Sequence, residues 1–167
     1  MRPLITRAQS NNKFSIARIE GSAALRGKGV FERAKGGLKF AKSHQCFLVD
    51  EGKVAFIVGG MERELVAGET IFVPAGFSFS FKMSGAYAGI YVFASGGGVE
   101  EMLRGVGQVY DLPVISNAAS LEVDEGKWKR LQRELAFEAL YGLTAEGGRL
   151  AFCDHQLEDK DGLFLKV

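Results

Sequence analysis

The sequence predicts an all-β fold followed by a C-terminal helical extension, on three observations. Short apolar stretches alternate with glycine-bearing turns from Phe14 to Phe93, which is typical of a β-sandwich or barrel. The chain has 22 glycines and only 3 prolines among 167 residues. This is about twice the average share of glycine and indicates many tight turns between short strands. After residue 98 the apolar residues follow helical spacing instead.

Three stretches predict strands. Residues 77–83, Phe-Ser-Phe-Ser-Phe-Lys-Met, alternate apolar and polar side chains without a fault, as a strand with one buried face requires. Residues 54–58 and 70–73 are apolar on both faces, and we expect these two strands to be covered on both sides. Glycines at 36–37, 59–60 and 85 mark turns between the strands.

A first helix is predicted directly after the β region. Its apolar face consists of Val99, Met102, Leu103 and Val106, at the spacing of an amphipathic helix. We expect Glu100, Glu101 and Arg104 on the solvent side. The resulting domain boundaries are 1–110 for the barrel with this helix and 111–167 for the extension and tail packed on it.

A second helix is predicted from about Asp124 to Tyr141, after a linker over 117–120. Its apolar stripe consists of Trp128, Leu131, Leu135 and Ala139, and Gly142 is a suitable C-terminal cap. The tail over 150–167 ends in an apolar stretch at 163–165, which we expect to dock on the rest of the chain.

Composition excludes several classes of function. Basic and acidic residues nearly balance, for a net charge of +1, which argues against a nucleic-acid-binding protein. No apolar run approaches the roughly 18 residues of a membrane helix, and the first residues lack the apolar core of a signal peptide. The two cysteines, Cys46 and Cys153, make no disulfide framework, so we predict a cytoplasmic protein with no nucleic-acid or membrane partner.

Two motifs in the β region carry a family resemblance. Residues 68–76, Gly-Glu-Thr-Ile-Phe-Val-Pro-Ala-Gly, resemble the start of the second conserved motif of the cupin superfamily. Residues 47–52, Phe-Leu-Val-Asp-Glu-Gly, resemble the end of the first. The segment over 98–107 is similar to the helix that follows the barrel in quercetin-dioxygenase-like cupins. The resemblance covers about residues 30–110 and implies a cupin-like β-barrel, a double-stranded β-helix or jelly roll, in a single domain.

This chain has neither His nor Glu at the positions where metal-binding members of this family carry their ligands. Metal-binding cupins use two His and one Glu from the first motif and one His from the second. Counting from Gly52, the Glu position is Gln45, and the second-motif His position is Phe79. The remaining His positions fall on Leu38 and Phe40, or on Lys39 and Ala41 if the spacer is one residue shorter. Because phenyl and alkyl groups offer no lone pairs to a transition metal, we expect no metal and no other cofactor.

The resemblance and the altered positions together suggest a function. We expect a metal-independent cupin-like enzyme acting on a hydrophobic small molecule, as an isomerase, dehydratase, lyase or cyclase, for example in secondary metabolism. Such proton-transfer chemistry needs only side-chain acids and bases and a shaped site. The alternatives are a non-catalytic protein that holds a small molecule in its apolar barrel, a barrel whose interior is simply core, and a dioxygenase with unconventional ligands.

Candidate catalytic residues are His44, Gln45 and Tyr91. Histidine titrates near neutral pH and can serve as acid and base. A strict alternation would point His44 outward, and a bulge at the barrel rim would turn it inward. Gln45 should face the interior, where its amide either ties down backbone or orients a ligand. His155 is a further, weaker candidate for closing the barrel mouth.

The predicted substrate pocket is aromatic. Its expected lining comprises Lys39, Phe47, Phe56, Phe79, Phe81 and Tyr87. Aromatic walls suit a planar or polycyclic ligand, although such a stripe equally suits a packed core. Alternation does not decide which way Tyr87 and Tyr91 face, because their neighbours are apolar too.

A homodimer is the expected assembly. Strands that are apolar on both faces need cover on the outside of the barrel, and two helices supply little of it. A second subunit related by a two-fold axis is the commonest way to provide such cover.

Overall fold

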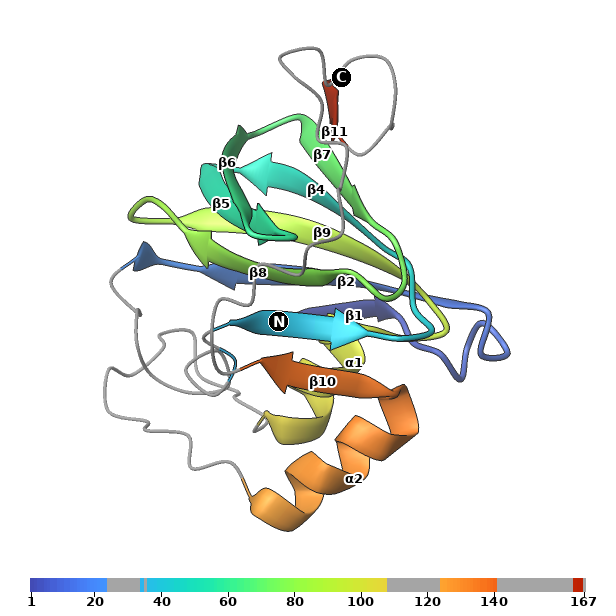
Figure 1. The fold of residues 1–167 in the computed structure, drawn as a ribbon. Helices are drawn as coiled ribbons and strands as arrows, with labels where there is room; N and C mark the ends of the chain where they lie inside the picture. The colour runs from blue at the N-terminus through green and yellow to red at the C-terminus, as the bar shows by residue number, and fades with distance from the viewer. Residues whose placement is uncertain (24–33, 35, 108–123, 141–163, 167) are drawn as a thin grey trace.

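The computed structural model describes residues 1–23, 34, 36–107, 124–140 and 164–166. Within them the chain forms nine short strands, then two helices and two further strands (Figure 1). In order, the elements are β1 (Arg2–Ile5), β2 (Phe14–Gly21), β3 (Gly37–Phe40), β4 (Gln45–Glu51), β5 (Lys53–Val58), β6 (Met61–Val66), β7 (Glu69–Val73), β8 (Ser78–Met83), β9 (Ala88–Ser95), α1 (Val99–Val106), α2 (Glu125–Leu135), β10 (Phe137–Leu140) and β11 (Phe164–Lys166).

The strands form two antiparallel sheets. The six-stranded sheet has the order β1-β2-β9-β4-β7-β11, and the five-stranded sheet has the order β10-β3-β8-β5-β6. Strands far apart in sequence are neighbours in both sheets, as in β2 beside β9 and β3 beside β8. The predicted all-β jelly roll with a C-terminal helix is therefore confirmed. No helix within the described residues is long and apolar enough to cross a bilayer.

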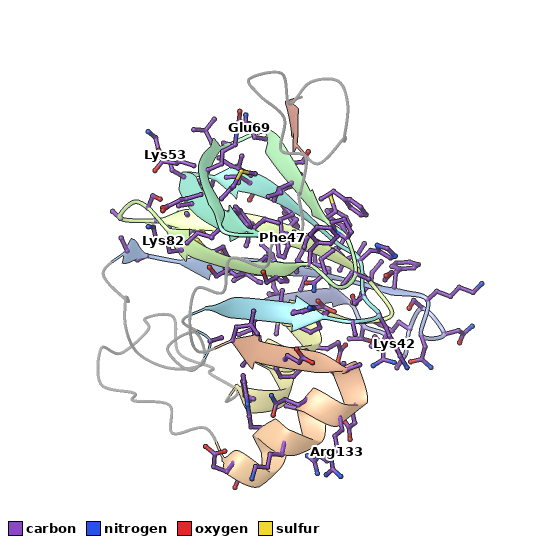
Figure 2. All side chains as sticks on the ribbon, in the orientation of Figure 1. Lys42, Phe47, Lys53, Glu69, Lys82 and Arg133 are labelled. Atoms are coloured by element: carbon purple, nitrogen blue, oxygen red, sulfur yellow. The ribbon has the colours of Figure 1, made fainter. Side chains whose placement is uncertain are left out.

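The core lies between the sheets, and a cluster of phenylalanine rings stands at its centre among aliphatic side chains. Phe47 of the six-stranded sheet is fully buried and meets the rings of Phe56 and Phe79 of the five-stranded sheet at centroid distances of 5.2 and 5.3 Å. Figure 2 shows Phe47 near the centre of the molecule. Burial of each such ring stabilises the fold by about 1.5–3 kcal/mol relative to an exposed one.

The hairpin between β4 and β5 depends on Gly52. Its φ is +74°, and a Cβ at this position would lie 2.4 Å from the Tyr87 carbonyl oxygen. Only glycine combines this backbone conformation with so close an approach of another strand. The glycine that ends the first motif is therefore required by local geometry.

The predicted strand patterns are confirmed on their inner faces. Phe79 and Met83 of β8 are buried, as are Val54 and Phe56 of β5. The expectation of cover on both sides is wrong for β7, because Phe72 on its outer face is 38% exposed. Within the described residues, the outer side of the six-stranded sheet is thus only partly covered at this strand.

Helix α1 has the predicted apolar face, with Val99, Met102 and Val106 buried. The prediction that Glu100 and Glu101 face solvent is wrong, because both are buried, at 4% and 9% exposure. The helix packs against β2, β9 and α2. It is therefore enclosed on more sides than a single apolar stripe implies.

Helix α2 begins where predicted, with the Asp124 carboxylate accepting a hydrogen bond from the Lys127 N–H. It ends at Leu135 rather than near Tyr141, and this part of the prediction is wrong. Ala136 takes a left-handed conformation, with φ 49° and ψ 50°, which turns the chain into β10. There Phe137 packs against Trp128 of α2, at a centroid distance of 5.2 Å.

The C-terminal extension adds to both sheets as well as supplying α2. Strand β10 pairs with β3, and β11 pairs with β7. The predicted docking of the apolar 163–165 segment corresponds in part to β11. The predicted linker over 117–120, the Gly142 cap, Cys153 and His155 lie outside the described residues.

Candidate functional site

The four positions that the motif counting assigned to metal ligands are all in the interior. Leu38, Phe40, Gln45 and Phe79 are all buried, with at most 2% exposure. Leu38 is paired with Phe79 across β3 and β8, and the rings of Phe40 and Phe79 are 6.1 Å apart. The structure thus brings Leu38, Phe40 and Phe79 together, and Gln45 is buried in the same interior.

The alternative spacing, through Lys39 and Ala41, does not reach the interior. Lys39 is half-buried on the face of β3 opposite Leu38 and Phe40, and Ala41 is exposed. Strand alternation is the reason, since neighbouring side chains point to opposite faces. Lys39 therefore lies outside the predicted pocket.

The residues at these positions do not fit a metal ion. Three of the four are hydrocarbon side chains, and Gln45 offers one amide; neutral amide and alkyl groups do not replace the imidazole and carboxylate ligands that transition metals prefer. Within the described ranges, no group of three or more His, Cys, Asp or Glu residues is placed to hold a metal.

The predicted pocket residues form a packed aromatic cluster. Phe47 is in ring contact with Phe56, Phe79 and Phe81, at centroid distances of 5.2 to 5.8 Å. Phe56 and Phe81 are 5.6 Å apart. These separations are those of mutually packed rings. The cluster has the packing of a core, which is one of the alternatives that the sequence left open.

Gln45 ties down the start of α1. Its side-chain Oε1 accepts a hydrogen bond from the Val99 N–H at 3.1 Å, in a buried setting. The residue before the helix, Gly98, has no side chain to do this, and a Cβ there would lie 2.6 Å from the Gln45 Cδ. Of the two roles that the sequence allows for this amide, the backbone tie is present.

Next to this contact lies a buried polar pair. Ser15 of β2 donates from its Oγ to Oε1 of Glu100, which also accepts from the Gly98 N–H at 2.9 Å. The second oxygen, Oε2 of Glu100, is buried and has no hydrogen-bond partner among the residues that the structure describes. Burial raises the pKa of the Glu100 carboxyl above its ordinary value, while the two donors oppose the shift. A carboxyl of this kind can hold a proton at a pH where an exposed one has lost it.

His44 lies on the surface at the start of β4, away from the interior. Its imidazole stacks on Phe72, at a centroid distance of 5.9 Å, and Nδ1 accepts from the Ala75 N–H at 3.2 Å. Its backbone N–H donates to the Ser95 Oγ. The structure therefore does not bring His44 together with Gln45, whose side chain points to the opposite face.

The two tyrosines also lie on the outer side of the six-stranded sheet. The guanidinium of Arg18 lies over the Tyr91 ring, 5.9 Å from its centroid. The Tyr87 hydroxyl donates to Glu20 at 2.7 Å, and this hydrogen bond raises the pKa of the phenol. Arg18 is paired with Asp50, and this pair raises the pKa of the guanidinium. Neither phenol lines the interior.

Sequence reasoning missed Ser15 and Glu100. Helical periodicity assigned Glu100 to the solvent face, because the apolar residues of the helix define the opposite face. The available signal was the run Gly96–Gly98, which gives the helix no capping side chain and leaves room for groups from β2 and β4.

Comparison with known proteins gives fold-level likeness at low similarity. No protein-family model matches the chain, and no curated protein matches it in sequence. Among solved structures, the Clostridium difficile EutQ protein is 18% identical with a TM-score of 0.42, over 56% of this chain and 64% of that one. The chain thus spans less than two thirds of that relative.

Two further solved structures are similar to the same degree. The Schizosaccharomyces pombe Cnp3 cupin domain is 19% identical with a TM-score of 0.42, over 64% of this chain and 70% of that one. A predicted oxalate decarboxylase from Thermotoga maritima is 17% identical with a TM-score of 0.45, over 56% and 76%. These scores carry no activity over to this chain.

Proposed function

We propose that this chain is a cupin-like protein that acts by binding through its outer surface, with the interior of the two sheets serving as core. The single observation that carries the proposal is where the expected site residues lie: the aromatic residues fill the interior, and the expected acid–base residues lie outside it. Phe79 and its aromatic neighbours are buried against one another, whereas His44 and Tyr91, the expected acid–base groups, lie on the outer face.

The proposal accounts for the altered ligand positions. A cupin-like chain that does not need a metal gains stability by filling three of the four inward positions with large apolar side chains, because each buried side chain removes apolar area from water. Gln45 is the one polar residue retained there, and its hydrogen bond to Val99 gives it a role in holding α1.

Native mass spectrometry of the purified protein, after incubation with Fe²⁺, Ni²⁺, Mn²⁺ and Zn²⁺ and removal of excess metal, tests the proposal. The folded chain should carry less than about a tenth of an equivalent of metal and no stoichiometric small molecule that denaturation releases. A near-stoichiometric metal that EDTA removes, or a released organic ligand, would contradict it.

A metal-independent isomerase, lyase or cyclase is a second candidate, favoured by the buried Ser15–Glu100 pair. A carboxyl with a raised pKa and one unpartnered oxygen has the properties of a general acid. A metabolite screen for turnover is the test. Activity that Glu100→Gln lowers by about 10²-fold or more would favour this candidate over the first.

A further inference from the structure

The outer face of the six-stranded sheet carries a continuous apolar row. In the strand register, Ile16 of β2 lies across from Phe93 of β9, Phe93 lies across from Cys46 of β4, and Cys46 lies across from Phe72 of β7. Ile5 of β1 extends the row beyond Ile16. Paired residues in adjacent strands point to the same face, so this row crosses five strands.

Two residues of the row are exposed, and the other three, Ile5, Ile16 and Cys46, are half-buried. Phe93 is 41% exposed and Phe72 is 38% exposed. Their inward neighbours Val92 and Ile71 are fully buried. Phe14, at the start of β2, is also among the exposed large apolar residues. Several neighbouring aromatic rings on one face of a sheet mark an interaction surface, whereas single exposed apolar residues do not.

The face is large enough for a stable contact. The five strands have 4, 8, 8, 7 and 5 residues. At about 3.3 Å per residue and about 4.8 Å between strands, they cover roughly 500 Å². Two such faces bury roughly 1,000 Å² in total, which is about the least that a specific protein interface needs.

The two ends of the face carry opposite charge. At one end, Glu20, Asp50 and Glu51 surround the guanidinium group of Arg18. Arg2 lies across from Arg18 in the strand register, so three carboxylates face two guanidinium groups and the excess is one negative charge.

The other end of the same strands carries lysines. Lys13 precedes β2, Lys42 lies just before β4, and both are exposed. Figure 2 shows Lys42 on the right of the molecule and Lys53 at the upper left. The Lys53 ammonium is 3.4 Å from Glu64 of the five-stranded sheet, so it is paired away from the face.

We propose that a second copy of this chain packs on this face, with the two-fold axis perpendicular to the strands and passing close to Cys46. This inference rests on the proposed function and names its partner. A two-fold contact requires a patch that complements itself. Reversing the strand direction places apolar row on apolar row and the Lys42 end of one copy over the Glu51 end of the other. Cys46 stands near the middle, between positions 42 and 51 of its strand.

Light scattering at micromolar concentration, with single substitutions, tests the location. The wild-type chain should give twice the 18.1 kDa of one chain. Phe93→Lys should raise the dimer Kd by at least about 100-fold, because it buries an unpaired charge in the centre of the contact. Met61→Lys is the matched control, since Met61 on β6 is 40% exposed; it should leave the dimer unchanged.

A charge exchange tests the orientation. Lys42→Glu or Glu51→Lys alone should raise the Kd by roughly tenfold, since each change acts twice across the axis. The double variant should restore most of the affinity. Circular dichroism checks that each variant is folded. If Phe93→Lys does not fold, Phe72→Lys is used in its place.

Cys46 supplies an independent readout. In a Cys153→Ser background, its alkylation by a maleimide should slow as protein concentration rises through the Kd, because the dimer covers the thiol. A wild-type monomer, a dimer that survives Phe93→Lys, or Met61→Lys acting as strongly as Phe93→Lys would overturn the location. Failure of the double exchange to restore affinity would overturn the orientation. None of these results bears on bound metal or ligand, so failure here differs from failure of the proposed function.

Discussion

Replacing Phe79 by alanine separates a packed core from an open pocket. The ring is 2% exposed and lies 5.3 Å from Phe47 and 6.1 Å from Phe40, measured between centroids. Removing it leaves a void that these buried neighbours can only partly fill. For a core phenylalanine, the lost transfer free energy and the cavity together lower the free energy of unfolding by about 3–5 kcal/mol.

Urea denaturation followed by circular dichroism, at one fixed protein concentration, measures this change. With an m-value of about 2 kcal/mol per molar urea, the midpoint of Phe79→Ala should fall by about 1.5–2.5 M. Met61→Ala, at a side chain 40% exposed on β6, should stay within about 0.5 kcal/mol. The cavity variant should also bind benzene, as engineered apolar cavities do.

A loss below about 1 kcal/mol for Phe79→Ala would refute the reasoning. It would mean that the ring lines a space instead of filling one, and that the interior is available to a ligand. The same conclusion would follow if the wild-type protein bound benzene as well as the variant does. The interior would then have to be treated as a binding site.

Three further predictions concern the helices. Gln45→Leu should lower the free energy of unfolding by about 1–3 kcal/mol in urea titrations, because it leaves the buried Val99 N–H without an acceptor; no loss would mean that this tie is not stabilising. For Glu100, burial raises the folded-state pKa above the unfolded value, so wild-type stability should fall as pH rises from the unfolded pKa to the folded one. Glu100→Gln should show no such loss of stability, and above the folded-state pKa it should be more stable than the wild-type protein. Ser15→Ala should still lose stability over this pH range. A Glu100→Gln variant with the wild-type dependence of stability on pH would contradict this. Ala136→Gly should raise the melting temperature, with a gain of about 1 kcal/mol, because glycine adopts the left-handed conformation without the Cβ penalty; a lower melting temperature would count against this.

Much of the fold was predictable because it depends on local pattern. The alternation over 77–83 identifies β8 and its inner face, and the helical spacing from Val99 to Val106 identifies α1. Motif counting also placed Leu38, Phe40, Gln45 and Phe79 in one interior region, because strand register carries such spacings into three dimensions.

The site could be predicted only in part, because its facing depends on contacts between distant segments. The tie between Gln45 and Val99 joins residues 54 positions apart, and that between Ser15 and Glu100 joins residues 85 apart. No periodicity within α1 indicates that two other strands enclose its first turn. The same limit explains the end of α2, where continued helical spacing competes with pairing of β10 to β3.

The sequence by itself determined the β class, the inward row of phenylalanines and the replacement of ligand-type residues. Only the tertiary structure decided that the phenylalanines contact one another and that His44 faces outward beside Phe72. It also decided that Phe93 is exposed on the outer face of the six-stranded sheet. The physical reason is that periodicity assigns side chains to one face or the other of an element. Which face is then covered depends on the packing of elements that are remote in the chain.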